Sequence, residues 1–214
     1  MKVITKAVLS ACLFAATQIA AATPFTITKV AFTPGSGYGT EWNEDPGKLL
    51  DVEFSTTGFT LQNFNLMNVG DQKRFKIGKV GFLEEDYFDF WTWSYYGGVS
   101  NGERDNLNVS LALTFTNPGT AVNTILANGV ATAGLVGDTG VDYSLAWTPL
   151  SASFGNGGKY TITLDTLQFK DNGWQDLYAT VSLTSAEVPE PGSLALIGLG
   201  LAGAGLARRR RQAR

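Results

Sequence analysis

Alternation of apolar and polar residues with a period of two is the feature that most constrains how this chain folds. Successive side chains of an extended strand point to opposite faces, so the alternation indicates strands with one buried face. The segments concerned are rich in Val, Thr, Phe and Tyr, which strands favour. They are residues 25–33, 49–56, 74–83, 106–115, 141–147, 159–169 and 176–185. No stretch between the two ends of the chain has an amphipathic helical period, so an all-β domain is predicted.

Turn signals separate many of these segments. Asn-Gly pairs readily take the positive φ angles that tight hairpins demand. The chain has four that we interpret as turns: Asn101-Gly102, Asn128-Gly129, Asn156-Gly157 and Asn172-Gly173. Many short strands with frequent glycine turns predict an antiparallel β-sandwich of jelly-roll-like layout, with a barrel as the alternative.

Two absences and one charge asymmetry limit the chemistry. The chain has no histidine, and its one cysteine, Cys12, lies near the N-terminus. The commonest general base, the commonest transition-metal ligand and thiol chemistry are therefore missing from the central domain. Residues 23–187 hold nine Lys and Arg against eighteen Asp and Glu. Such an acidic domain repels phosphate backbones, so we predict no nucleic-acid partner.

The first 22 residues have the layout of a secretory signal peptide. Lys2 and Lys6 precede an apolar stretch at 7–16, and three alanines at 20–22 offer small residues to signal peptidase. We predict cleavage after Ala22. A lipoprotein signal ending at Cys12 is the alternative, but it leaves almost no apolar region before the cysteine.

The last segment, residues 188–214, combines a break, a short apolar span and a basic end. Both prolines of Pro189-Glu190-Pro191 lack an amide donor, which disfavours helix and strand. The uncharged stretch 193–207 is about 24 Å long as a helix, short of the roughly 30 Å of a hydrocarbon core. A cluster follows that would stay on the cytoplasmic side: Arg208, Arg209, Arg210 and Arg211. We predict a single short transmembrane helix that passes through the inner membrane. A plain membrane anchor is the alternative.

These three parts, in this order and at the C-terminus, resemble the PEP-CTERM sorting signal. The resemblance covers about 27 residues, and a signal peptide accompanies it at the other end. It implies that an exosortase, a membrane transpeptidase, recognises Pro189, Glu190 and Pro191 as substrate and cuts nearby. It also implies a Gram-negative host, an inner-membrane intermediate, and delivery to the cell surface or the extracellular matrix.

Aromatic and acidic residues are densest at 84–96. If this segment is one extended strand, alternate residues share a face: Tyr87, Asp89, Trp91, Trp93 and Tyr95. Flat rings beside carboxylates suit sugar binding, which makes these residues candidates for glycan contact. The alternative is that the rings fill the core of the sandwich.

Acidic residues raise two further alternatives. The cluster Glu84, Glu85, Asp86 and Asp89 holds enough carboxylates for a glycoside hydrolase, although nothing in the sequence sets their separation. Calcium favours such oxygen ligands, here and at Asp138 with Asp142 or Glu41 to Asp45, but none of these groups has EF-hand spacing. We predict solvated acidic loops, with no metal or other cofactor.

Together these features predict a non-enzymatic exported protein of the surface or matrix that associates with exopolysaccharide. The alternative is an exported carbohydrate-active hydrolase that uses the cluster at Glu84 to Asp89. Signal peptidase and an exosortase are the expected processing partners.

Overall fold

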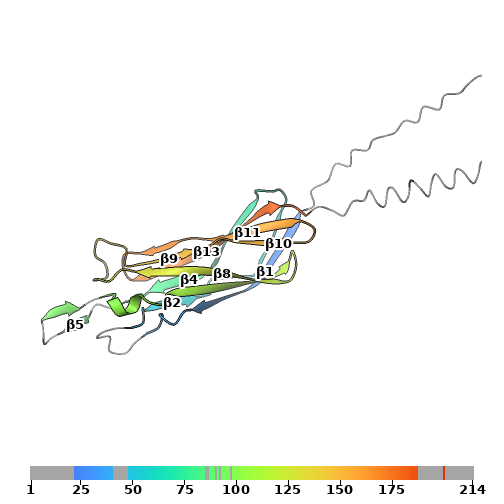
Figure 1. Ribbon diagram of the computed structural model, residues 1–214. Coiled ribbons are helices and arrows are strands. Elements are labelled where there is room, and N and C mark those ends of the chain that lie inside the picture. The colour runs from blue at the N-terminus through green and yellow to red at the C-terminus, as the bar shows by residue number, and fades with distance from the viewer. Residues whose placement is uncertain are drawn as a thin grey trace, which may run out of the picture.

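The computed structural model of the 214-residue chain describes residues 22–40, 48–84, 87–89, 91, 93–96, 98–187 and 200. Strands and one short 3-10 helix make up its regular structure (Figure 1). They are β1 (Thr23–Pro34), β2 (Val52–Ser55), β3 (Gln62–Leu66), β4 (Gln72–Phe82), β5 (Tyr87–Asp89), β6 (Ser94–Tyr96), η1 (Asn101–Arg104), β7 (Asn108–Asn117), β8 (Ala121–Ala131), β9 (Tyr143–Trp147), β10 (Leu150–Phe154), β11 (Gly158–Leu164), β12 (Leu167–Phe169) and β13 (Gly173–Ser185). The all-β prediction is therefore confirmed.

Two antiparallel sheets form the body of the domain. A six-stranded sheet has the order β12-β9-β8-β7-β1-β3, and a five-stranded sheet has the order β10-β11-β13-β4-β2. Their facing sides meet in one core that contains every buried apolar side chain from Phe25 to Leu183. The jelly-roll-like connectivity goes beyond what these two sheets establish and stays a prediction.

Aromatic rings join the two sheets across this core. Phe25 of β1 meets Tyr160 of β11 edge-on, with ring centroids 5.4 Å apart. Nearer the other end of the strands, Tyr143 of β9 stacks on Phe82 of β4 at 5.8 Å. Burial of such large apolar surfaces is the main stabilising contribution in a domain that has no cysteine between residues 23 and 187.

Six of the seven predicted strand segments coincide with single strands. The exception is residues 159–169, which divide into β11 and β12 at Asp165 and Thr166. These two strands belong to different sheets, so the prediction of one continuous strand was wrong. The alternation continues through the break because the chain crosses from one sheet to the other while both strands keep facing the same core.

The Asn-Gly pairs behave differently from one another. Asn156-Gly157 lies in the turn between the paired strands β10 and β11, as predicted. Asn101-Gly102 instead begins η1. Asn172-Gly173 leads into β13, whose first residue is Gly173, and does not join two strands that pair. Asn128-Gly129 lies inside β8, so the prediction of a turn there was wrong.

The sandwich has two distinct ends. At one end, here called the terminal end, Thr23 pairs with Leu66, and the backbone N–H of Asn156 donates to the Glu187 carboxylate. At the opposite end, the hairpin end, lie the β5–β6 hairpin and η1 (Figure 1). β1 and β13 run in opposite directions between these ends, so β1 starts and β13 finishes at the terminal end.

The processing segments predicted at both ends of the chain lie outside the described residues, apart from Ala22 and Gly200. In the part of the chain that the structure covers, no helix has both the length and the apolar character needed to cross a membrane.

Candidate functional site

The aromatic and acidic segment forms a hairpin and not the single extended strand that we expected. β5 pairs with β6, and the register sets Tyr87 against Tyr96 and Phe88 against Tyr95. Tyr95 therefore takes a position opposite Phe88, and the prediction that it continues the row of Tyr87 and Asp89 was wrong. The chain reverses because residues 91 and 93 form the turn between the strands, where Trp93 has a φ of 51°.

The two tryptophans of this turn are the most exposed large apolar side chains that the structure describes. Trp91 is 96% exposed and Trp93 is 80% exposed. The alternative prediction, in which these rings fill the core, is wrong for both. An indole ring at the surface offers a large flat face with one hydrogen-bond donor, which suits contact with another molecule.

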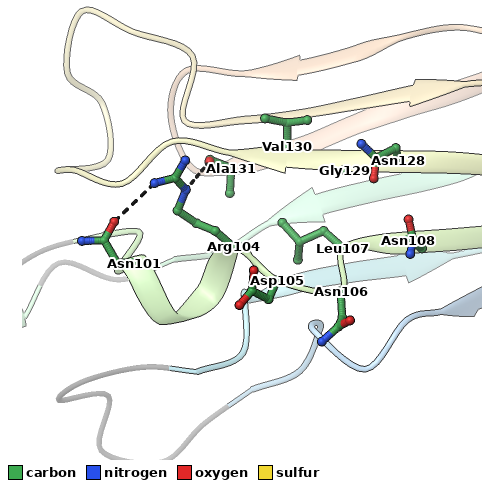
Figure 2. A pocket seen from close by; sticks show the side chains of 10 residues that line it. All are labelled: Asn101, Arg104, Asp105, Asn106, Leu107, Asn108, Asn128, Gly129, Val130 and Ala131. Atoms are coloured by element: carbon green, nitrogen blue, oxygen red, sulfur yellow. Dashed lines mark hydrogen bonds between the residues drawn. The ribbon is translucent and has the colours of Figure 1, made fainter.

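A polar hollow of about 470 Å³ lies at the same end of the sandwich (Figure 2). Its walls come from η1, the start of β7 and the end of β8. Asn108 and Asn128 lie directly opposite each other in the β7–β8 register, and both side chains are exposed. Amide side chains carry donors and acceptors together, so a pair of them can bind a hydroxyl group in either sense.

Arg104 holds η1 against the end of β8. Its Nε donates to the Ala131 carbonyl at 3.1 Å, and its Nη1 donates to Asn101 Oδ1 at 3.3 Å (Figure 2). Both acceptors are uncharged, and Arg104 makes no ion pair with any carboxylate in the described part of the chain. Its remaining donors can therefore serve a hydroxyl or carboxylate group of a ligand in the hollow.

A second hollow of about 450 Å³ shares Asn108 with the first and adjoins it there. Its walls include Pro34 of β1, Ser110 of β7 and Leu126 of β8. Together the two hollows form what we call the groove, which runs along the outer face of the six-stranded sheet. The outward positions of β8 supply Leu126, Asn128 and Val130 in a row, so apolar and amide groups alternate along it.

Two tyrosines support the floor of the groove: Tyr143 is fully buried and Tyr38 is half-buried. The Tyr38 hydroxyl donates to the Leu107 carbonyl at 2.7 Å and lies 2.9 Å from the Tyr143 hydroxyl. Since the single proton of Tyr38 is used on Leu107, Tyr143 is the donor between the two rings. Burial raises the pKa of Tyr38 to about 12 and raises the pKa of Tyr143 well above its ordinary value, so both keep their protons at neutral pH.

Three of the acidic residues singled out in the sequence have described side chains, and each makes its own backbone contact. Glu84 is fully buried, and its Oε1 accepts the backbone N–H of Asp51. Asp138 and Asp142 accept the backbone N–H groups of Gly140 and Gly137. Glu85, Asp86 and residues 41–45 lie outside the described residues. The side chain of Asp89 does too. Where the chain is described, no three acidic residues come together as a metal site.

Most residues of the groove were missed in the sequence. β8 was not predicted because its outward positions, with Val122, Leu126 and Val130, are as apolar as its inward ones. The alternation that marks a half-buried strand is therefore absent from 121–131. A signal was present in the Asn-Gly pairs at 101 and 128, whose asparagines both line the groove.

Comparison with known proteins identifies one part of the chain. Residues 187–211 match the PEP-CTERM protein-sorting motif, which confirms the resemblance seen in the sequence. The motif indicates an exported protein that passes through a membrane and is sorted by an exosortase. No curated protein and no solved structure matches the chain. The predicted sorting residues, Pro189 to Pro191 and Arg208 to Arg211, fall within the matched range but outside the described residues.

Proposed function

We propose that this chain is a non-enzymatic protein that an exosortase delivers to the surface or extracellular matrix of a Gram-negative bacterium, where it binds exopolysaccharide. The observation that carries the binding role is the groove, which offers amide pairs, one guanidinium and apolar side chains along an exposed sheet. Saccharide rings present hydroxyl groups at their edges and C–H groups on their faces. Alternating amide and apolar side chains suit both kinds of group.

The Trp91–Trp93 turn supports the same proposal. It lies at the hairpin end, and only a few residues separate β6 from Asn101, which lines the groove. A long polymer that occupies the groove could therefore also contact the indole rings. Carbohydrate recognition commonly pairs flat apolar faces with a few placed polar groups.

Binding of the purified domain to polysaccharide tests the molecular role. We expect residues 23–187 to bind the exopolysaccharide of the host, and Asn128→Ala to weaken that binding about tenfold, because one amide of the facing pair is lost. Trp91→Ala with Trp93→Ala tests the hairpin separately. Isothermal titration and affinity electrophoresis in polysaccharide gels provide the measurement.

Thr124→Ala is the matched control, since Thr124 is exposed on β8 outside both hollows. Dextran and alginate serve as neutral and acidic comparison polymers. Alginate bound more tightly than dextran, with the difference lost in Arg104→Ala, assigns that guanidinium to a sugar carboxylate. A folded domain that binds no polysaccharide at all contradicts the binding role.

Sorting is tested in the host with the full chain. We expect the exported wild-type protein to lack Arg208 to Arg211, because the exosortase cuts near Pro189. Glu190→Ala should accumulate in the inner membrane with the arginines intact. Mass spectrometry of the C-terminal peptide in each cell fraction measures both. Glu53→Ala, an exposed acid on β2, should be sorted like the wild type. An intact arginine cluster on the surface protein contradicts processing.

The hydrolase alternative is tested in the same polysaccharide incubations. Shortening of the polymer by the wild-type domain, lost in Glu85→Gln or Asp89→Asn, replaces the non-enzymatic proposal with that alternative. The full burial of Glu84 favours the non-enzymatic proposal, because a buried carboxyl group does not reach a polymer.

A further inference from the structure

The edge of the six-stranded sheet at β3 has no further strand beside it in the described part of the chain. β3 pairs with β1 on one side and is the last strand of its sheet on the other. An edge strand presents backbone N–H and C=O groups that can pair with another strand, and natural proteins usually protect such edges with charges or prolines. β3 lies within the run 54–70, which contains no charged residue and no proline.

A large apolar side chain lies at each end of this edge strand. Leu61, just before β3, is 60% exposed, and Met67, just after it, is 59% exposed. Between them the side chains of Asn63 and Asn65 are exposed, while Phe64 faces inward and stacks on Phe25. The strand therefore shows solvent a row of apolar, amide, amide and apolar groups.

This row of side chains reads the same in both directions, so it matches the same row of a second copy that runs antiparallel to it. In an antiparallel pair of two β3 strands centred on Phe64, Leu61 of one copy lies opposite Met67 of the other. Asn63 lies opposite Asn65 in the same way. Each apolar group thus meets an apolar group and each amide meets an amide, twice in one contact related by a twofold axis.

Charge also favours a second copy at this position. The domain carries twice as many acidic as basic residues, so two copies repel each other over most of their surfaces. The exposed side chains of the run 54–70 are uncharged, and the Asp71 carboxylate that follows the run accepts the backbone N–H groups of Met67 and Asn68, so two copies meet less of that repulsion here. We infer that β3 is a self-association edge, through which two copies of this chain pair antiparallel about Phe64 and extend the six-stranded sheet from one copy into the next.

This inference depends on the sheet edge alone and is independent of polysaccharide binding. The contact is small, so single pairs are expected to be weak and to strengthen where many copies are held together. Residues 23–187 contain both sheets and the whole buried core and are therefore suitable for the test.

Sedimentation equilibrium tests the pairing. We expect the wild-type domain to dimerise with rising concentration, and Asn65→Lys to raise the dissociation constant about tenfold or more, because a charge is placed against the facing amide. Thr124→Lys adds the same charge to the exposed face of β8 and should dimerise like the wild type. Circular dichroism verifies that each variant is folded.

Disulfide trapping tests the register. The domain has no cysteine between residues 23 and 187, so an introduced thiol reacts against no background. A mixture of Asn63→Cys and Asn65→Cys domains should form a cross-linked heterodimer under mild oxidation, whereas each variant alone should form far less. A wild-type domain that stays monomeric at all concentrations overturns the inference. So does an Asn65→Lys domain that dimerises undiminished, or cross-linking that does not depend on mixing.

Discussion

Truncation of Tyr143 to alanine is expected to lower the free energy of unfolding by about 4 kcal/mol. The ring is fully buried and stacks on Phe82 at 5.8 Å and on Phe169 at 5.8 Å. It also meets Tyr38 edge-on. Removal of the ring leaves a cavity between the two sheets and removes the donor to the Tyr38 hydroxyl.

Chemical denaturation of residues 23–187 measures this loss. Tyr143→Phe is the matched control, because it keeps the ring contacts and removes only the hydroxyl. We expect it to cost about 1 kcal/mol, the usual contribution of one hydrogen bond. Equal losses for the two variants would show that the hydroxyl, and not the packed ring, stabilises this end of the core.

Gly129→Ala is expected to destabilise the domain by about 3 kcal/mol through overpacking. A Cβ at this position would lie far inside van der Waals contact of the Tyr38 hydroxyl, 2.9 Å from the Leu107 carbonyl oxygen and 3.0 Å from Tyr143 Cε2. The two strand backbones cannot separate easily, because the Gly129 N–H donates to that same Leu107 carbonyl at 2.7 Å. Polysaccharide binding should weaken too, since Gly129 and Leu107 both line the groove.

Tyr38→Phe should partly rescue this variant. It removes the hydroxyl that the new methyl group would strike, while the Leu107 carbonyl keeps its bond from the Gly129 N–H. In a double-mutant cycle we expect the two changes together to cost about 1–2 kcal/mol less than the sum of the single changes. Strict additivity would show that the methyl group is accommodated elsewhere and that the Tyr38 hydroxyl does not limit the space.

The strands that the sequence revealed are those with one apolar face. β1, β4, β7 and β13 follow a period of two because one face of each meets the core. β8 was not predicted as a strand, because both of its faces carry apolar residues. β3 and β10 are too short and too polar to show the alternation. The order of the strands in each sheet could not be predicted from the sequence, since alternation shows which side of a strand is buried and not which strand lies beside it.

The candidate site also has parts that could be predicted from the sequence and parts that could not. Trp91 and Trp93 were recognised in the sequence as a dense aromatic cluster, and both are exposed. The turn that these two residues form between β5 and β6 was not predicted, because residues 84–96 contain no glycine or proline to mark it. The groove could not be predicted, since Asn101, Asn108 and Asn128 come together only through the pairing of β7 with β8 and the position of η1.

The position of both chain ends at the terminal end has a consequence for where paired copies can be held. The sorting motif begins at residue 187, where β13 has just finished, so a retained molecule is attached by that end and directs its hairpin end outward. Antiparallel pairing through β3 turns one copy end over end relative to the other. Because β3 lies at the terminal end, where Leu66 pairs with Thr23, the two attachment points then lie close together near the middle of the pair, and the two hairpin ends point away from each other. Neighbours attached to one surface both point outward and do not match this geometry. The pairing that we infer for the β3 edge therefore suits copies released from the membrane rather than copies held side by side on a single cell.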